Sequence, residues 1–207
     1  MGGTFDPIHN GHMMVARAAL RLGLDRVELV PARQPPHKTR PDISDPFQRY
    51  AMAALASVGE PRIGVCPFEV AREGPSYSID TVRSFAAPSR ELFLIMGSDS
   101  LAEIDTWREC RALLDLARLL VYPRRPFSSR PFDQFIATLP EWVRQKREEG
   151  AIVALEGPPD DASSTALRRL VRMGGPVAEH LPPAVAEFIS KNNLYTRDAR
   201  GLEADAD

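Results

Sequence analysis

The chain has 207 residues, of which 43% are hydrophobic and 26% charged, a size and balance that exclude a disordered protein and predict one domain over residues 1–197. The formal net charge of −2 excludes a broad basic surface, so nucleic acid is not an expected partner. Apolar runs stay far short of the roughly 20 residues that a bilayer requires, and no secretory signal is recognisable, so no membrane is expected and a cytoplasmic location is predicted.

Both cysteines and the carboxyl end of the chain are expected to carry no chemistry. Cys66 and Cys110 match no paired metal spacing, and a reducing compartment would keep them as thiols that pack in the interior. Residues 198–207, which end in acidic and small side chains, are predicted to form a disordered tail facing solvent. Monomer and homo-oligomer both stay open.

Apolar residues recur along the chain at the spacings of alternating helices and strands. Four of them, from Val15 to Leu22, stand at i, i+3, i+4 and i+7, which predicts a helix that begins just after His12 and ends at Gly23. Further helices are predicted over residues 47–58, 79–85, 100–116, 132–149, 164–172 and 183–191, and strands over residues 27–31, 62–66, 91–96, 117–122 and 151–155.

This alternation predicts an α/β fold, a Rossmann-like doubly wound parallel sheet with helices on both faces. Ligands bind such sheets beyond the carboxyl ends of the strands, where the motif-rich loops of this chain fall. The glycine-rich opening should itself follow a strand, yet only Met1 precedes it. Either the chain begins upstream of Met1 or the sheet lacks its first strand, and we expect an upstream apolar segment before Gly2.

The opening residues have the chemistry of a phosphate site. Gly2, Gly3 and Gly11 allow close backbone approach, and the helix that follows offers free N–H groups and a positive dipole end to an anion. His9 and His12 stand three residues apart, so their rings can share a face and donate to phosphate oxygens. A structural histidine or a zinc pair is the alternative, but no third ligand of recognisable spacing accompanies them.

The stretch from residue 2 to residue 12, Gly-Gly-Thr-Phe-Asp-Pro-Ile-His-Asn-Gly-His, resembles the signature of the nucleotidyltransferase superfamily, whose T/H-x-G-H element holds ATP phosphates. Later stretches resemble, in the right order, the motifs of the bacterial nicotinate-nucleotide adenylyltransferase family: residues 31–38, 74–81, Gly97-Ser-Asp99 with Trp107, and 163–168. The resemblance implies the superfamily's fold and the transfer of AMP from ATP to nicotinate mononucleotide, giving nicotinate adenine dinucleotide and pyrophosphate in NAD biosynthesis.

The resemblance also implies roles for residues on the ATP side. Arg168 lies one turn into a predicted helix and can present its guanidinium to an anion, whereas a solvated arginine is the alternative. Hydroxyls at the start of that helix can cap it, contact phosphate, or do both. A helix cap is likewise the alternative for Asp99, and Asp6 is expected to be a turn residue. The implied catalytic residues are His9, His12 and Arg168, and the implied ATP-binding residues are Gly3, Thr4, Phe5, Gly11, Gly97, Asp99, Ser164 and Thr165.

Two small departures from the family pattern lie near this helix. Leu167 replaces a common isoleucine, and Ala162 stands where the motif often has another isoleucine. Both changes concern the packing behind the helix.

A second set of residues is implied to bind the mononucleotide. His37 and Lys38 follow two prolines that stiffen their loop, and in the resembled family this loop faces the anionic mononucleotide; Arg40 can assist, and a solvated basic loop is the alternative. The resemblance implies that the nicotinate carboxylate is read near Tyr77 and Ser78, although such a stretch is often a simple turn. It also implies that the pyridine ring stacks on Trp107, a residue that would otherwise belong to the core.

The implied reaction is direct attack on the α-phosphorus of ATP without a covalent enzyme intermediate, so catalysis rests on alignment and charge neutralisation. Mg²⁺ is expected to arrive with ATP, since it prefers phosphates and water to full protein cages, and no residue is expected to be a dedicated metal ligand. Two alternatives stay open. Phosphopantetheine adenylyltransferase shares the opening but would lack the stretches at 35–38 and 74–81, and a silent ATP-binding sensor would have no chemical need for His9, His12 and Arg168 together.

Overall fold

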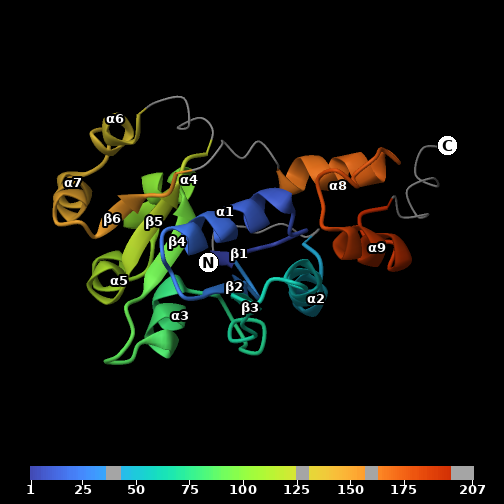
Figure 1. The fold of residues 1–207 in the computed structure, drawn as a ribbon, viewed down its shortest axis with the longest axis horizontal. Helices are drawn as coiled ribbons and strands as arrows, with labels where there is room; N and C mark the ends of the chain where they lie inside the picture. Colours follow the sequence, from blue (N-terminus) through green and yellow to red (C-terminus); the bar gives the residue numbers. More distant parts are fainter. Residues whose placement is uncertain (36–42, 125–130, 157–162, 197–207) are drawn as a thin grey trace, which may run out of the picture.

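A computed structural model describes residues 1–35, 43–124, 131–156 and 163–196, in which short strands and helices alternate (Figure 1). The strands are β1 (Gly2–Gly3), β2 (Val27–Pro31), β3 (Ile63–Val65), β4 (Phe93–Gly97), β5 (Arg118–Tyr122) and β6 (Ile152–Ala154). The helices are α1 (Asn10–Arg21), α2 (Pro46–Ala56), α3 (Ser78–Phe85), α4 (Ser98–Ala102), the 3₁₀ turn η1 (Ile104–Thr106), α5 (Cys110–Leu116), α6 (Phe132–Ile136), α7 (Glu141–Glu148), α8 (Ser164–Arg172) and α9 (Pro183–Lys191). Within these ranges no helix has the length and apolar character to cross a membrane.

All the strand pairs are parallel and form two sheets, β1-β2-β3 and β4-β5-β6. The two sheets meet where β1 lies against β4, so the strands run in the order 3-2-1-4-5-6 across the molecule. This is the strand order of the doubly wound Rossmann fold. The point at which the order of the strands reverses lies between β1 and β4. The predicted fold class is therefore confirmed.

The sheet has its first strand, so the expectation that it lacks one is wrong. Gly2 and Gly3 pair with Val30 and Pro31, and the ladder continues on both sides, since Val30 N donates to Met1 O at 2.9 Å and Ala32 N donates to Gly3 O at 2.9 Å. Glycine is a poor strand former, so the sequence hides this strand. A Cβ on Gly3 would lie 2.8 Å from the ring of Phe5, which requires glycine there. An upstream segment stays a prediction.

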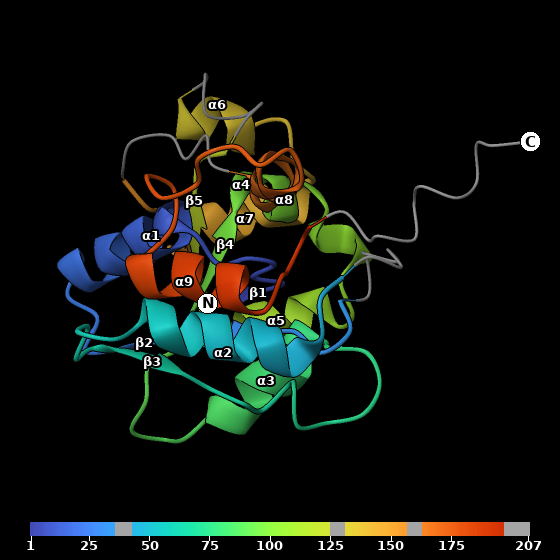
Figure 2. The same ribbon diagram turned by 90° about the vertical axis from the view of Figure 1, so that its right-hand side faces the viewer.

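Two hydrophobic clusters hold helices on both faces of the sheet. The first cluster contains residues of α1, α2, α8, α9 and β2. The second contains residues of the helices from α3 through α7 and of β4, β5 and β6. β4 contributes to both, because Ile95 belongs to the first cluster whereas Leu94 and Met96 belong to the second, as alternate strand residues point to opposite faces. Figure 2 shows α9 alongside α2, and residues of both helices belong to the first cluster.

Most predicted elements are confirmed, and the predictions at 27–31, 164–172 and 183–191 match the observed bounds. Two long predicted helices are wrong. Residues 100–116 form α4, η1 and α5, separated at Trp107, which is extended, and at Glu109, which is left-handed with φ 51°. Residues 132–149 form α6 and α7, separated before Pro140, because proline cannot continue a helix and restricts the residue before it. Leu22 caps α1 and is exposed rather than on its buried face.

Candidate active site

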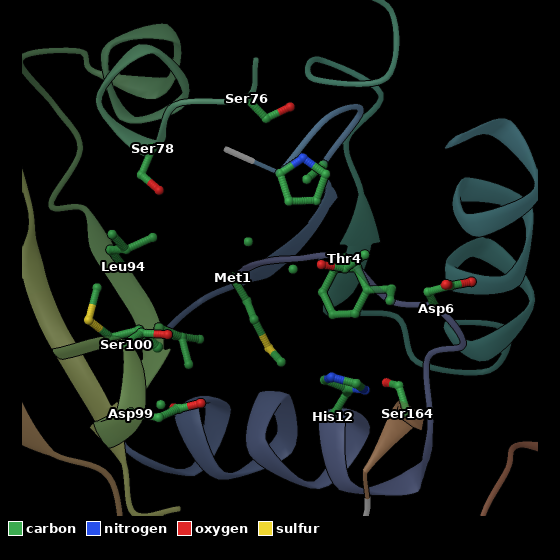
Figure 3. A pocket seen from close by; sticks show the side chains of 18 of the residues that line it. Met1, Thr4, Asp6, His12, Ser76, Ser78, Leu94, Asp99, Ser100 and Ser164 are labelled. Atoms are coloured by element: carbon green, nitrogen blue, oxygen red, sulfur yellow. The ribbon is translucent and has the colours of Figure 1, made fainter. Parts of the chain in front are cut away.

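A cavity of about 1010 Å³ opens at the carboxyl ends of β1 and β4, where the strand order reverses (Figure 3). Ligands of doubly wound sheets bind at this point. The cavity is lined by most of the residues implied by the sequence: Gly3, Thr4, Phe5, His12, Tyr77, Ser78, Gly97, Asp99, Trp107, Ser164, Thr165 and Arg168. His9 and Gly11 are buried and do not line it, and His37, Lys38, Arg40 and Ala162 lie outside the described residues, as does the tail.

His12 rises from the first turn of α1 toward the cavity (Figure 3). Its Nδ1 accepts a hydrogen bond from the backbone N–H of His9 at 3.2 Å, and Phe5 packs edge-on against its ring at 5.1 Å between centroids. Because Nδ1 is an acceptor, the neutral ring carries its proton on Nε2. The hydrogen bond to Nδ1 therefore fixes the orientation of the His12 ring at the cavity, and the predicted role of His12 at the phosphates stays a prediction.

His9 is fully buried, with its ring centroid 3.7 Å from that of His12. Desolvation by burial, followed by the charges of Arg124 and His180, lowers the pKa of His9 to about 3. The ring is therefore neutral at physiological pH and offers one donor rather than two. The predicted role of His9 at the phosphates stays a prediction. In this structure the His9 ring packs against the ring of His12.

We expect His9 to make the fold sensitive to acid. In the unfolded chain its pKa returns to the ordinary value near 6.5, so below that pH only the unfolded state takes up the proton, and stability falls as pH falls toward 3. The free energy of unfolding should drop by about 2 kcal/mol between pH 8 and pH 5 from this group alone. Urea unfolding of the wild type and of His9→Asn over this range measures it; equal pH dependence in both proteins would contradict the prediction.

Arg168 on α8 is nearly buried and already held by the opening loop, so the alternative of a solvated arginine is wrong. Its Nη1 donates to the backbone oxygen of Asp6 at 2.6 Å and lies 3.8 Å from Asp6 Oδ2, while its Nη2 donates to Thr165 Oγ1 at 3.2 Å. Asp6 does lie in a turn as expected, but it is also a buried partner of Arg168. This second role was missed because its partner is 162 residues away.

The hydroxyls at the start of α8 make different hydrogen bonds. Ser163 Oγ accepts from the backbone N–H of Ala166 at 3.4 Å and so caps the helix. Ser164 Oγ donates to Pro7 O at 3.0 Å, which ties α8 to the opening loop. The capping role is therefore observed for Ser163, whereas phosphate contact by Ser164 and Thr165, which line the cavity with Ser163, stays a prediction.

Asp99 lies in the first turn of α4, but Gly97 is the capping residue of that helix, so the cap interpretation of Asp99 is wrong. Its Oδ2 lies 3.6 Å from Arg124 Nη1 at the cavity wall. A Cβ on Gly97 would lie 2.1 Å from Asp99 Oδ1, so glycine is what lets the carboxylate fold back over the end of β4. Asp99 thus lies over the end of β4 beside the cavity, with Arg124 as its ion-pair partner.

The other side of the cavity carries the residues predicted for the mononucleotide. Trp107 is half-buried, packs against the second cluster and also lines the cavity, so it is both a core residue and a cavity wall. The guanidinium of Arg108 lies 4.9 Å from the ring centre of Tyr77, close enough for a cation–π contact. An aromatic wall with a cation beside it suits a flat, anionic ring.

Glu69, which sequence reasoning missed, ties this wall together from inside. It is nearly buried and accepts a hydrogen bond from Thr81 Oγ1. Burial raises the pKa of its carboxyl above the ordinary value, while hydrogen bonds from Thr81 and Ser76 oppose that shift. Ser76 in turn accepts from Arg33 N at 3.0 Å and donates its own N–H to Gln34 O at 3.0 Å. The loop at 74–78 is thereby joined to the loop after β2.

Arg49 on α2 is fully buried and was also missed. Its guanidinium donates to three backbone oxygens, of Thr4 at 2.7 Å, Ser44 at 2.9 Å and Arg33 at 3.0 Å. Burial lowers its pKa from the ordinary value, with the charge of Asp6 acting in the opposite direction. It connects the opening loop with the loop after β2. One sequence signal existed: Arg49 shares helical spacing with buried Met52, Ala53 and Ala56.

Among the described residues, no group of three or more His, Cys, Asp or Glu side chains is placed to hold a metal ion. Cys66 and Cys110 are unpaired thiols and half-buried, less buried than expected. The cavity therefore combines hydroxyls, imidazole and guanidinium groups with an aromatic wall.

The comparisons with known proteins agree with this arrangement. The cytidylyltransferase-like family model matches residues 1–170. A probable nicotinate-nucleotide adenylyltransferase of Tropheryma whipplei is 38% identical over 94% of this chain and 97% of its own length, and one of Frankia alni is 40% identical over 94% and 98%. In structure, the chain resembles the Plasmodium falciparum nicotinic acid mononucleotide adenylyltransferase complexed with NaAD, with a TM-score of 0.70, 18% identity and 94% of each chain covered. At that identity the likeness concerns the fold.

Proposed function

The chain belongs to the cytidylyltransferase-like family and, within it, to the nicotinate-nucleotide adenylyltransferases, and from this premise we infer its reaction. It is an enzyme of NAD biosynthesis that transfers AMP from ATP to nicotinate mononucleotide, giving nicotinate adenine dinucleotide and pyrophosphate. The observation that carries this function is the cavity between β1 and β4, because His12 of α1, Ser164, Thr165 and Arg168 of α8 and the aromatic wall of Tyr77 and Trp107 line it together.

The reaction needs two anions to be brought into line. A phosphate oxygen of the mononucleotide forms a bond to the α-phosphorus of ATP, and the bond from that phosphorus to the β-phosphate oxygen breaks, so pyrophosphate leaves with the electron pair. Negative charge grows on the phosphoryl oxygens and on the leaving group during this displacement. Donors fixed before the reaction stabilise that charge without reorganisation.

The proposed donors come from both sides of the opening loop. His12 would donate through Nε2, since its Nδ1 is occupied by the His9 N–H. Thr4, Ser164 and Thr165 line the same wall, and Arg168 adds a positive charge held in place by Asp6. The support for these roles is position and chemistry: each offers a donor at the cavity where the strand order reverses.

We propose that Mg²⁺ enters as a complex with ATP. The described residues offer no three-ligand cluster for a resident ion, and Mg²⁺ keeps phosphate and water ligands readily. The ion would neutralise phosphate charge when bound. The proposed place of action is the cytoplasm, which suits the unpaired thiols of Cys66 and Cys110.

A pyrophosphate-release assay tests the function directly. The purified chain is incubated with Mg²⁺ and ATP and with one acceptor at a time: nicotinate mononucleotide, nicotinamide mononucleotide or pantetheine phosphate. We expect release with nicotinate mononucleotide, together with a product whose mass is that of nicotinate adenine dinucleotide. Release with pantetheine phosphate alone would instead assign the related adenylyltransferase, and no release with any acceptor would indicate a sensor.

A further inference from the structure

The segment that follows α8 reaches back to the opening loop at two points. The backbone oxygens of Glu179 and His180 accept hydrogen bonds from Asn10 Nδ2 at 3.0 Å and from Asn10 N at 2.9 Å, at the start of α1. Further along, Tyr195 Oη donates to Asp6 Oδ1 at 2.7 Å. The match to the cytidylyltransferase-like family model ends at residue 170, so the partners of Asn10 and Asp6 in these contacts lie beyond that match.

Tyr195 adopts a backbone conformation that is unusual for its type. Its φ is 63°, in the left-handed region that bulky residues rarely occupy, and it follows the hydrogen bond from Leu194 N to Ile189 O at 3.0 Å that ends α9. Its ring packs against the first cluster, and its hydroxyl lies 4.0 Å from Met52 Sδ. Strained conformations persist where surrounding contacts hold them, and they gather at functional sites.

Asp6 stands between Tyr195 and Arg168 and is itself almost fully buried. Its Oδ1 accepts from Tyr195, its backbone oxygen accepts from Arg168 Nη1 at 2.6 Å, and its Oδ2 lies 3.8 Å from the same nitrogen. Burial, followed by the negative charge of Asp6, raises the pKa of Tyr195 above its ordinary value, so the hydroxyl keeps the proton that it donates. Without that hydroxyl, a buried carboxylate oxygen would lose its donor.

We propose that Tyr195 is a positioning residue of the active site, which fixes the carboxylate of Asp6 and through it the guanidinium of Arg168 against the phosphates of ATP. The proposal rests on the proposed function, because Arg168 matters only if it meets a phosphate. It gives the carboxyl-terminal segment a part in the reaction as well as in folding.

Tyr195→Phe removes one oxygen and keeps the ring that packs against α2. We expect kcat/KM for ATP to fall about tenfold, the factor expected when a buried carboxylate loses one hydrogen bond. A matched control removes the hydroxyl of Tyr50, on the same helix as Met52 but outside the cavity wall, and Tyr50→Phe should retain wild-type kcat/KM. Circular dichroism and urea unfolding establish that both variants are folded under assay conditions.

The path through Arg168 is tested by combining substitutions. Arg168→Lys keeps the charge but loses the fork that Asp6 and Thr165 hold, so the hydroxyl of Tyr195 has less left to position. In that background Tyr195→Phe should cost less than about threefold, because residues that act as a unit are not additive. A loss under threefold in the wild-type background, or the same loss in both backgrounds, would overturn the proposal.

Equilibrium binding of ATP separates this inference from the reaction itself. Calorimetry on Tyr195→Phe should show weaker ATP binding than the wild type, with Tyr50→Phe unchanged. Should the wild type bind ATP yet transfer no AMP to nicotinate mononucleotide, the proposed function fails, while the binding comparison still decides the role of Tyr195. Equal ATP affinity for Tyr195→Phe and the wild type would count against that role.

Discussion

Replacing His12 with alanine is expected to lower kcat by at least ~10², the effect of losing one donor to a charge that develops in the transition state. The ring is oriented before substrate arrives, since Nδ1 accepts from His9 N and Phe5 packs on its edge, so no energy is spent on aligning it during the reaction. KM for nicotinate mononucleotide should change much less, because Tyr77 and Trp107 are untouched. Steady-state rates of pyrophosphate release measure both.

Two companion variants sharpen this test. His180→Ala removes an exposed histidine that does not line the cavity, and it should keep near-normal kcat. His12→Gln retains a side-chain donor of a different shape and should fall between wild type and alanine. A kcat of His12→Ala within threefold of wild type would contradict the assignment of His12 to the reacting phosphates.

Arg49→Met should cost the fold about 3 kcal/mol or more, although Arg49 itself does not line the cavity. The methionine fills a similar volume but leaves the oxygens of Thr4, Ser44 and Arg33 without their donor, and each unsatisfied buried group costs about 1–3 kcal/mol. Relaxation and entering water will recover part of that sum. Urea unfolding with a common m-value gives the difference in free energy.

Arg49→Lys distinguishes charge from geometry at this position. Lysine keeps a cation but has no planar fork to reach three oxygens at once, so it should recover only part of the lost stability. Recovery to the wild-type value would mean that charge alone suffices. A stability of Arg49→Met within 1 kcal/mol of wild type would mean that the three bonds contribute little net free energy.

Sequence reasoning succeeded where chemistry is local. The opening loop and the start of α8 each lie within a short stretch of sequence, the family resemblance implied the roles of Tyr77 and Trp107, and twelve of the implied residues do line one cavity. Strand β2 was predicted with its observed bounds, since the run over residues 27–31 is short, mostly apolar and contains two valines. These predictions needed no knowledge of distant contacts.

The sequence did not reveal interactions whose two partners lie far apart in the chain or in which one partner is a backbone group. Asp6, Arg49 and Tyr195 have partners that lie 162, 45 and 189 residues distant in the chain, and no periodicity carries that information. Strand β1 was not predicted because its two glycines are extended through pairing with β2 and not through their own residue preference. The broken helix around Trp107 kept a helical apolar spacing, and tertiary packing decided against it.

The shared cavity has a consequence for inhibition. Because one cavity of about 1010 Å³ would take both substrates, a weak fragment placed beside His12 and Arg168 and another stacked on Trp107 could be joined by a short linker. Binding of the second part then becomes intramolecular, with an effective concentration on the order of millimolar. The linker would cross the junction of β1 and β4, because the two groups of lining residues lie on either side of it. Its length would therefore have to match the separation of the two fragments across that junction.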